Sequence, residues 1–388
     1  MIDNLKMFGI KTKIFFGRGG ISDLGEIAKQ AGGGKFLVVG DPGLEEHGML
    51  ARVRESLQNA GLTGKEFLDV EPEPYLDGAD NAARLGKEIG ADLVVGVGGG
   101  STMDTAKAAA ILITNEGAAE DYIGLEKVPN PGVPTIMIPT TAGTGAEVTF
   151  TAVFTNRETK AKGGINSSHM FPEVALLDPE LTMTLPPDVT AATGMDALTH
   201  AVESVTSRSS TVFTEALALT AIRLISENLR RTVFRGSEDI EARENMLLGS
   251  LLGGLALADA GVGAAHALAY PLGGNYRVPH GLANAILIPH VMEFNLPAAV
   301  RQFALVAAAM GEAVEGLPSR QAAASAVYAV SGLCDDIGIP ASLSELGIPT
   351  SDIPMLVESA LTVTRPVENN PRTLGPEEAQ GIYYSAFE

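Results

Sequence analysis

The chain is poor in the residues that mark several classes of protein. It has a single cysteine, Cys334, no tryptophan, and only 5% aromatic residues. One cysteine excludes an internal disulfide and is typical of a reducing compartment. No apolar run is long enough for a membrane span, and the N-terminus has neither an apolar core nor a cleavage signal. We therefore expect no transmembrane helix and a cytoplasmic location.

Positive charge is also scarce. Lysine and arginine number 27 against 47 aspartates and glutamates, so the net charge is −20. This balance argues against nucleic acid and anionic membranes as partners, because both are recognised through clustered cations. With 388 residues, the chain can build two domains with cores of their own.

The first half alternates buried strands with helices. Short apolar, β-branched runs predict strands over residues 35–39, 66–70, 92–97 and 135–139. Strands separated by helices predict a parallel, doubly wound sheet. From residue 188 onward, leucine, alanine and methionine dominate with helical spacing. We expect an α/β dinucleotide-binding domain over residues 1–185 and an all-helical metal- and substrate-binding domain over residues 186–388, with the substrate held between them.

A candidate metal site lies in the second half. Asp196 and His200 stand four residues apart and share one face of a predicted helix. By itself such a pair is more often a surface pair on a helix than a metal site. His266, on a short helix predicted to end at Pro271, and His280 add two imidazoles in glycine-flanked segments. One carboxylate and three imidazoles suit a divalent first-row metal.

A candidate phosphate site follows the strand at residues 92–97. Gly98, Gly99, Gly100 and Ser101 lead directly into a predicted helix. Glycines allow close backbone approach, and a helix N-terminus offers free N–H groups to a pyrophosphate. Ser101 breaks the pattern G-x-G-x-x-G, and no Walker motif is present. Without further information the run could also be a tight turn.

Two more segments are suited to nucleotide binding. Thr140, Thr141 and Thr144 follow the strand at residues 135–139, although Ser/Thr-rich turns are common. Asp41 follows the strand at residues 35–39. A carboxylate there can accept hydrogen bonds from the adenosine ribose and repel a 2′-phosphate. Aspartate before proline is also a frequent turn residue.

Four long motifs resemble the iron-dependent (group III) alcohol dehydrogenase family. They read GGGSTMDTAK (98–107), PTTAGTGAEVT (139–149), GMDALTHAVES (194–204) and PHGLANAILIPHVMEFN (279–295). The resemblance covers most of the chain. It implies NAD as cofactor, a bound Fe(II), or Zn(II) in its place, and a homo-oligomer that is at least a dimer.

The resemblance also assigns residues. It implies metal ligation by Asp196, His200, His266 and His280. It implies cofactor binding by Asp41, Gly98, Gly99, Gly100, Ser101, Asp104, Thr140, Thr141, Thr144, Thr149 and Lys162.

Two positions depart from the family's pattern. Glu73 stands where many relatives carry an asparagine that approaches the cofactor, so a cofactor role for Glu73 is not implied. Tyr270 stands where some relatives carry a histidine associated with proton handling. The Tyr270 hydroxyl could relay a proton or simply form part of the pocket wall, so we assign Tyr270 to the substrate pocket without a defined role.

The expected activity is that of an NAD-linked alcohol dehydrogenase or aldehyde reductase on small primary alcohols. The metal would act as a Lewis acid, and hydride would pass directly between substrate and nicotinamide. One alternative is a lyase similar to the dehydroquinate synthases, which also use NAD and a metal. Basic residues do not cluster around the ligand motifs, which argues against its phosphorylated substrate. A non-catalytic binding protein is opposed by the intact ligand set and cofactor loop.

Overall fold

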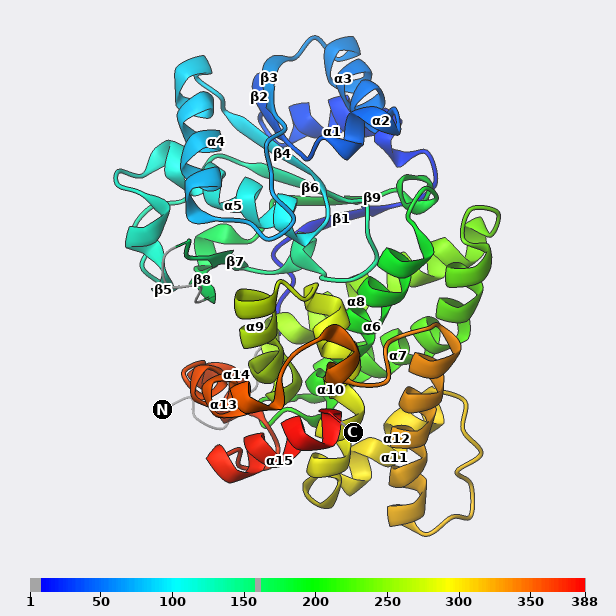
Figure 1. Ribbon diagram of the computed structural model, residues 1–388. Helices are drawn as coiled ribbons and strands as arrows, with labels where there is room; N and C mark the ends of the chain where they lie inside the picture. The colour runs from blue at the N-terminus through cyan, green and yellow to red at the C-terminus, as the bar shows by residue number, and fades with distance from the viewer. Residues whose placement is uncertain (1–7, 158–161, 388) are drawn as a thin grey trace. The chain divides into compact units, whose positions relative to one another are not determined.

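The computed structural model describes residues 8–157 and 162–387 (Figure 1). They form two compact units. The α/β unit contains Ile10–Thr141 and Gly145–Thr184. The helical unit contains residues 185–387, together with Ala142–Thr144 and residues 8–9. The segment Ala142–Thr144 thus belongs to the helical unit although its sequence neighbours on both sides belong to the other.

A six-stranded parallel sheet forms the centre of the α/β unit. Its strands lie in the order β1 (Lys13–Phe16), β9 (Val174–Leu177), β6 (Thr135–Pro139), β4 (Leu93–Gly98), β2 (Lys35–Val39) and β3 (Thr63–Phe67). Every residue of β4 and β6 is buried, as expected for strands covered on both faces. The expected parallel α/β fold is confirmed.

The third strand begins earlier than predicted. It spans Thr63–Phe67 rather than residues 66–70, and its first three residues are exposed. This strand lies at the edge of the sheet, where burial does not select apolar side chains. The hydrophobic pattern of the sequence therefore did not indicate where this strand begins.

Helices cover both faces of the sheet (Figure 1). Phe36 and Val38 of β2 pack in one core with the first helices, whereas Leu37 and Val39 pack in a second core on the opposite face. The first core includes η1 (Gly20–Asp23), α1 (Leu24–Gln30), α2 (Gly43–Glu46) and α3 (Met49–Asn59). The second includes α4 (Leu76–Ile89) and α5 (Gly100–Thr114).

The order of the strands reverses between β2 and β4. From β2 the chain passes through α3 to β3, on one side of the pair. From β4 it passes through α5 to β6, on the other side, and α3 and α5 lie on opposite faces. In doubly wound sheets, ligands bind beyond the carboxyl ends of the strands at such a reversal. The position next to β2 and β4 is therefore the expected ligand-binding edge.

A second, three-stranded sheet was not predicted. It consists of β5 (Gly124–Leu125), β8 (Lys162–Asn166) and β7 (Thr151–Thr155), and the pair β7–β8 is antiparallel. Glycines within β8 weaken its strand signal in the sequence. Short 3-10 turns complete this unit at Ala119–Tyr122, Ala146–Val148, Ser168–Met170 and Pro179–Thr182.

The helical unit is built around α6 (Pro187–Thr206). This helix packs against α7 (Val212–Arg235), α8 (Ile240–Ala260) and α10 (His280–Asn295), and α10 also packs against α9 (Ala264–Tyr276). The remaining helices are α11 (Val300–Ala309), α12 (Ser319–Asp336), α13 (Ile353–Leu361), α14 (Thr364–Asn369) and α15 (Pro376–Phe387), with 3-10 turns at Leu296–Ala298, Leu343–Leu346 and Thr350–Asp352.

Helix α9 does not end at Pro271, so that prediction was wrong. It continues to Tyr276 with the proline inside it. Proline removes one hydrogen bond and normally stops or bends a helix. Here Leu268, Ala269 and Leu272 on both sides of the proline are buried, and this packing outweighs the local cost.

In the described chain, no single helix combines the length and apolarity of a membrane span. Helices α8 and α9 reach these values only when they are counted together, and they meet at an angle of 104°.

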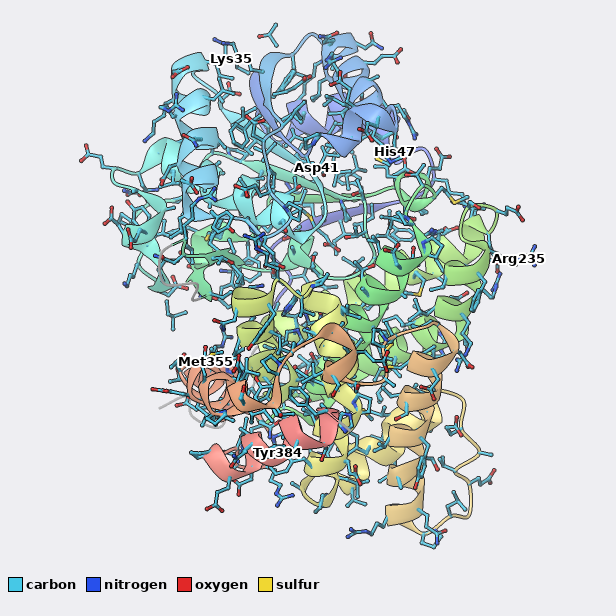
Figure 2. The ribbon with its side chains drawn as sticks, viewed as in Figure 1. Lys35, Asp41, His47, Arg235, Met355 and Tyr384 are labelled. Carbon is cyan, nitrogen blue, oxygen red and sulfur yellow. The ribbon has the colours of Figure 1, made fainter. Side chains whose placement is uncertain are left out.

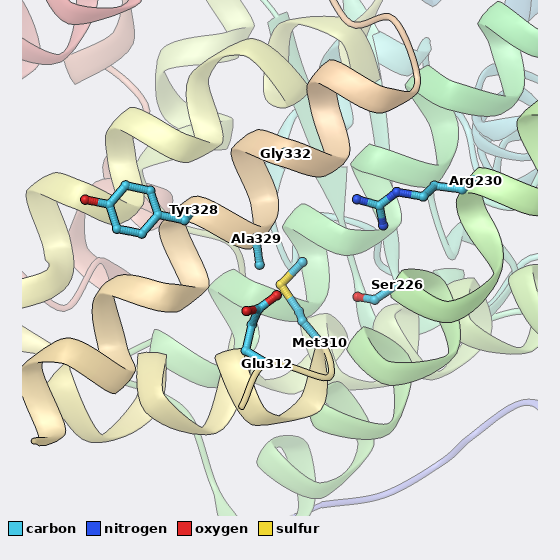
Figure 3. Close-up of a pocket in the computed structure, with 7 residues that line it drawn as sticks. All are labelled: Ser226, Arg230, Met310, Glu312, Tyr328, Ala329 and Gly332. Atoms are coloured by element: carbon cyan, nitrogen blue, oxygen red, sulfur yellow. The ribbon is translucent and has the colours of Figure 1, made fainter. Parts of the chain in front are cut away.

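A surface cavity of about 290 Å³ lies on the helical unit, and none of the residues that line it is a predicted site residue (Figure 3). Its only arginine, Arg230, already donates from Nε to Asp336 at 2.7 Å, so its charge is balanced within the protein. The cavity is lined by Ser226, Arg230, Met310, Glu312, Tyr328, Ala329 and Gly332.

The close approach of α10 to α6 requires glycine at position 281. A methyl group there would lie 2.3 Å from the carbonyl oxygen of Ala192 and 3.2 Å from Cβ of Asp196. We predict that Gly281→Ala lowers the stability by about 1–3 kcal/mol, the usual cost of overpacking. Thermal unfolding measures this effect.

Gly332→Ala is the matched control, because Gly332 is also helical and a methyl group there meets nothing within 4 Å. It should unfold at the same temperature or higher, since alanine favours a helix by about 0.5–1 kcal/mol. Equal unfolding temperatures for both variants would contradict the packing argument.

Candidate metal centre and nucleotide-binding edge

Three of the four predicted ligands form a buried cluster in the helical unit. Asp196 and His200 lie one turn apart on α6, and His266 lies near the start of α9. One ligand atom from each lies within 4.8 Å of the others. Oδ1 of Asp196 is 4.0 Å from Nε2 of His200 and 3.8 Å from Nε2 of His266. The cluster joins residues that are far apart in sequence.

The fourth predicted ligand lies beside this compact trio. His280 is the first residue of α10, and its Nε2 is 3.8 Å from Oδ1 of Asp196. Its side chain is 28% exposed, whereas the other three are buried. The ring of Tyr270, one turn after His266, stacks on His280 with 5.7 Å between centroids and 9° between planes. Tyr270 therefore packs on the most accessible ligand.

The cluster fits a divalent metal. Nε2 of His266 is buried and has no hydrogen-bond partner among the described residues. A buried polar nitrogen without a partner is unfavourable unless something else binds it. Imidazole and carboxylate donors at these separations suit a first-row divalent ion.

The three buried groups differ in the direction of their pKa shifts. The pKa values of Asp196 and His200 are lowered, whereas burial lowers the pKa of His266 but Glu203 and Asp196 raise it overall. Burial alone would raise the pKa of Asp196, but His200, His280 and His266 and a hydrogen bond from Asn284 lower that pKa overall. Burial lowers the pKa of His200, so its neutral form is favoured. An ionised carboxylate and a neutral imidazole are the forms that coordinate metal.

Three groups that the sequence analysis did not select contact the ligands. The Glu203 carboxylate lies 2.6 Å from Nδ1 of His266. The Asn284 amide donates to Oδ1 of Asp196 at 2.8 Å. The carbonyl of Gly143 lies 3.3 Å from Nδ1 of His200. Glu203 is seven residues after Asp196 and Asn284 four after His280, so helical spacing from the predicted ligands could have identified both.

The predicted phosphate loop lies at the carboxyl end of β4. Gly98 has φ +153°, and a methyl group there would lie 2.6 Å from Oγ1 of Thr102, so glycine is required. Gly99 precedes α5, which begins at Gly100. The Ser101 hydroxyl donates to the carbonyl of Pro72. Free N–H groups at the start of a long helix are available here to an anion.

The other predicted residues of this edge flank the loop. The Thr140 N–H donates to the carbonyl of Gly98 at 3.0 Å, and a methyl group on Gly99 would be 3.6 Å from the Thr141 side chain. Asp41 follows β2, the neighbour of β4, and Figure 2 shows it at the end of the strand opposite to Lys35. One Asp41 oxygen accepts the Gly43 N–H at 2.9 Å, so the turn role is present.

Thr144 belongs to the helical unit, apart from the other predicted cofactor residues. Asp104 accepts the Val153 N–H at 2.9 Å and pairs with Lys107 at 3.0 Å. Burial raises the pKa of Asp104, and Lys107 and that N–H oppose the rise. Lys162 pairs with Glu73 at 2.6 Å. Glu73, which stands where many relatives carry an asparagine, therefore balances the charge of Lys162, a predicted cofactor-binding residue.

Lys107 was also missed by the sequence analysis. Its buried ammonium donates to the Ala146 carbonyl at 3.1 Å, to Oγ1 of Thr149 at 3.4 Å, and to the Thr151 carbonyl. It thus ties α5 to the segment that contains Thr149. Every donor of a buried ammonium needs an acceptor, so this segment is fixed in place by the lysine.

Glu147 in the same segment gives a pH-dependent prediction. Burial raises its pKa from 4.5 to about 7, against the effect of its own N–H and Lys107. The folded protein therefore holds a proton that the unfolded chain loses above pH 4.5, and this contribution to stability is lost as the pH rises through 7. Glu147→Gln cannot ionise and should be more stable than the wild type at pH 8, by up to roughly 3 kcal/mol.

Thermal unfolding of both proteins between pH 5 and pH 8.5 measures this difference. The advantage of Glu147→Gln should shrink towards pH 5. A difference that stays constant over this range would contradict the raised pKa.

Comparison with known proteins identifies the class. Residues 11–179 match the family model "iron-containing alcohol dehydrogenase", and residues 190–387 match the C-terminal model of the Fe-containing alcohol dehydrogenase family. A 1,3-propanediol dehydrogenase of Citrobacter freundii is 43% identical over 375 residues, which is 96% of each chain. Lactaldehyde reductase of Escherichia coli K12 is 38% identical over 375 residues, 96% of this chain and 97% of the relative.

A solved structure agrees with these matches. The crystal structure of a 1,3-propanediol oxidoreductase superposes with a TM-score of 0.96 at 41% identity and covers 99% of this chain and 100% of its own. Fold and site thus define a metal-dependent dehydrogenase. The chain belongs to the iron-containing alcohol dehydrogenase family and is an enzyme of that type. The alternatives of a lyase and of a non-catalytic protein are not favoured.

Proposed function

We propose that this enzyme interconverts small primary alcohols and their aldehydes with NAD as the hydride carrier. The observation that carries the proposal is the buried cluster of Asp196, His200 and His266, in which Nε2 of His266 has no partner in the described part of the chain. Relatives named 1,3-propanediol dehydrogenase, lactaldehyde reductase and NAD-dependent methanol dehydrogenase support the class of substrate and the cofactor.

Asp196, His200, His266 and His280 would hold the metal, which we propose to be Fe(II). When bound, the ion supplies positive charge that polarises the carbon–oxygen bond of the substrate. Sites of nitrogen and oxygen ligands bind Zn(II) more tightly than Fe(II), so the support for iron is the family alone. Protein prepared without oxygen should contain iron, and full zinc occupancy with undiminished activity would count against it.

The protein's own residues orient and shield the reacting groups. His280 is the partly exposed ligand, and Tyr270 stacks on it, so we propose that Tyr270 forms part of the substrate pocket. Asp196, His200 and His266 are buried, and burial would strengthen electrostatic effects on a substrate bound beside them.

We propose that NAD binds at the edge where β2 and β4 end. The N-terminus of α5, with Gly98, Gly99, Gly100 and Ser101, would take the pyrophosphate. Asp41 would face the adenosine ribose. Thr140, Thr141, Thr144, Thr149, Asp104 and Lys162 complete the proposed contacts.

We further propose a cytoplasmic homo-oligomer, with cofactor binding assigned to residues 1–185 and metal and substrate binding to residues 186–388. The edge strand β1 exposes 37% of both Phe15 and Phe16, which supports association with another copy through this edge. The single cysteine, Cys334, is buried, which is consistent with a reducing compartment.

The metal assignment is tested with His266→Ala. We predict that this variant loses bound metal and the oxidation of NADH by small aldehydes but still binds NADH, because the two proposed sites lie in different units. Elemental analysis, a panel of aldehydes and NADH fluorescence measure the three properties. His47→Ala, at an exposed histidine of the α/β unit, should behave as the wild type. Turnover by metal-free His266→Ala would disprove the assignment.

The cofactor choice is tested with Asp41→Gly. The Asp41 carboxylate would repel a neighbouring 2′-phosphate by about 4 kcal/mol at 4 Å and an effective dielectric constant of 20. Partial exposure to solvent weakens this repulsion. We therefore expect NADPH to bind about two orders of magnitude more weakly than NADH. We predict a strong preference for NADH that Asp41→Gly weakens. The ratio of kcat/KM for NADH and NADPH in both proteins measures it. An unchanged ratio would leave Asp41 with its turn role only.

A further inference from the structure

We propose that Glu203 is a positioning residue that fixes the His266 ring for metal binding and balances the charge of the metal site. This inference rests on the proposed metal site and concerns a residue outside its ligand set. Glu203 lies on α6 on the same face as Asp196 and His200, and it is only 4% exposed.

The carboxylate of Glu203 accepts three hydrogen bonds from the turn that begins α9. Oε2 accepts from Nδ1 of His266 at 2.6 Å and from the Gly263 N–H at 2.8 Å. Oε1 accepts from the Ala265 N–H at 2.7 Å. All three donors lie within four consecutive residues, so Glu203 fixes both the backbone and the ring.

These contacts decide which nitrogen of His266 carries a proton. An ionised carboxylate can only accept, so in the neutral form of the ring, which binds metal, the proton lies on Nδ1 and a bare Nε2 faces the cluster. Nε2 lies 3.8 Å from Oδ1 of Asp196 and has no hydrogen-bond partner within residues 8–157 and 162–387. A carboxylate on the outer nitrogen also makes the inner nitrogen a stronger donor to metal.

The contacts that orient the rings of His200 and His266 differ in strength. Nδ1 of His200 faces the neutral carbonyl of Gly143 at 3.3 Å, whereas Nδ1 of His266 faces a charged carboxylate at 2.6 Å. Charged hydrogen bonds are shorter and stronger than neutral ones. His266 is therefore the more firmly oriented imidazole.

Glu203 also completes the charge balance. With neutral imidazoles, Asp196 alone would leave a divalent ion and its ligands with net positive charge in a buried place. The second buried carboxylate, Glu203, brings the sum to zero. Uncompensated buried charge is strongly unfavourable, so removing this carboxylate should weaken binding of the cation.

The test is Glu203→Gln, which keeps size and shape but removes the charge. Metal-depleted protein is titrated with Zn²⁺, and anaerobically with Fe²⁺, in competition with a chelator of known affinity. We expect affinity to fall 10–100-fold, the usual effect of losing such a partner. Nitrogen NMR of the metal-free protein, recorded at a pH above the His266 titration, should show the Nδ1–H form of His266 in the wild type and a mixture in the variant.

Glu147→Gln is the matched control, because it makes the same change at a buried carboxylate of the other unit. Its metal affinity should equal that of the wild type. If Glu203→Gln does not fold, Glu203→Asp retains the charge with poorer reach and should bind metal more weakly than the wild type.

Wild-type metal affinity in the folded Glu203 variant would overturn the proposal, as would an unchanged His266 tautomer in Glu203→Gln. Wild-type protein that binds neither ion would instead refute the metal site itself. The two failures are therefore distinguishable.

Discussion

The buried charge of Asp196 is the constraint on which the helical unit depends. A carboxylate removed from water is costly unless donors or cations surround it. Here the compensating groups come from α6, α9 and α10, which therefore have to meet at one place. Gly281 allows that approach, because any side chain there would strike the Ala192 carbonyl. The close packing of α10 on α6 is thus also what brings the predicted ligands together.

The α/β unit also contains a buried charge, but a positive one. Lys107 is buried, and its ammonium is surrounded by acceptors from Asp104 and from the segment after Gly145. Lys107 belongs to α5, and the N–H groups that begin this helix lie near Gly100. An internal cation thereby fixes the helix whose N-terminus we propose as the phosphate site.

Sequence reasoning predicted the features that burial and spacing make visible. Apolar runs predicted β4 and β6, and the Asp196–His200 spacing predicted a pair on one helical face that the structure confirms. Features held by long-range contacts were less predictable. A glutamate such as Glu203 is usually solvent-exposed on a helix, and only the fold of α9 reveals its three donors. The contact of Gly143 with His200 involves a backbone carbonyl, which carries no signal in the sequence.

The segment Ala142–Thr144 has a consequence for how far the protein can be divided. It packs with the helical unit although it is reached only through strands of the α/β unit, so the chain passes between the units repeatedly rather than once. A fragment beginning at residue 186 would contain all four proposed metal ligands but lack the carbonyl of Gly143 that faces His200. The proposed metal site would therefore be incomplete in an isolated C-terminal fragment, because the fragment lacks a contact that orients one of the proposed ligands.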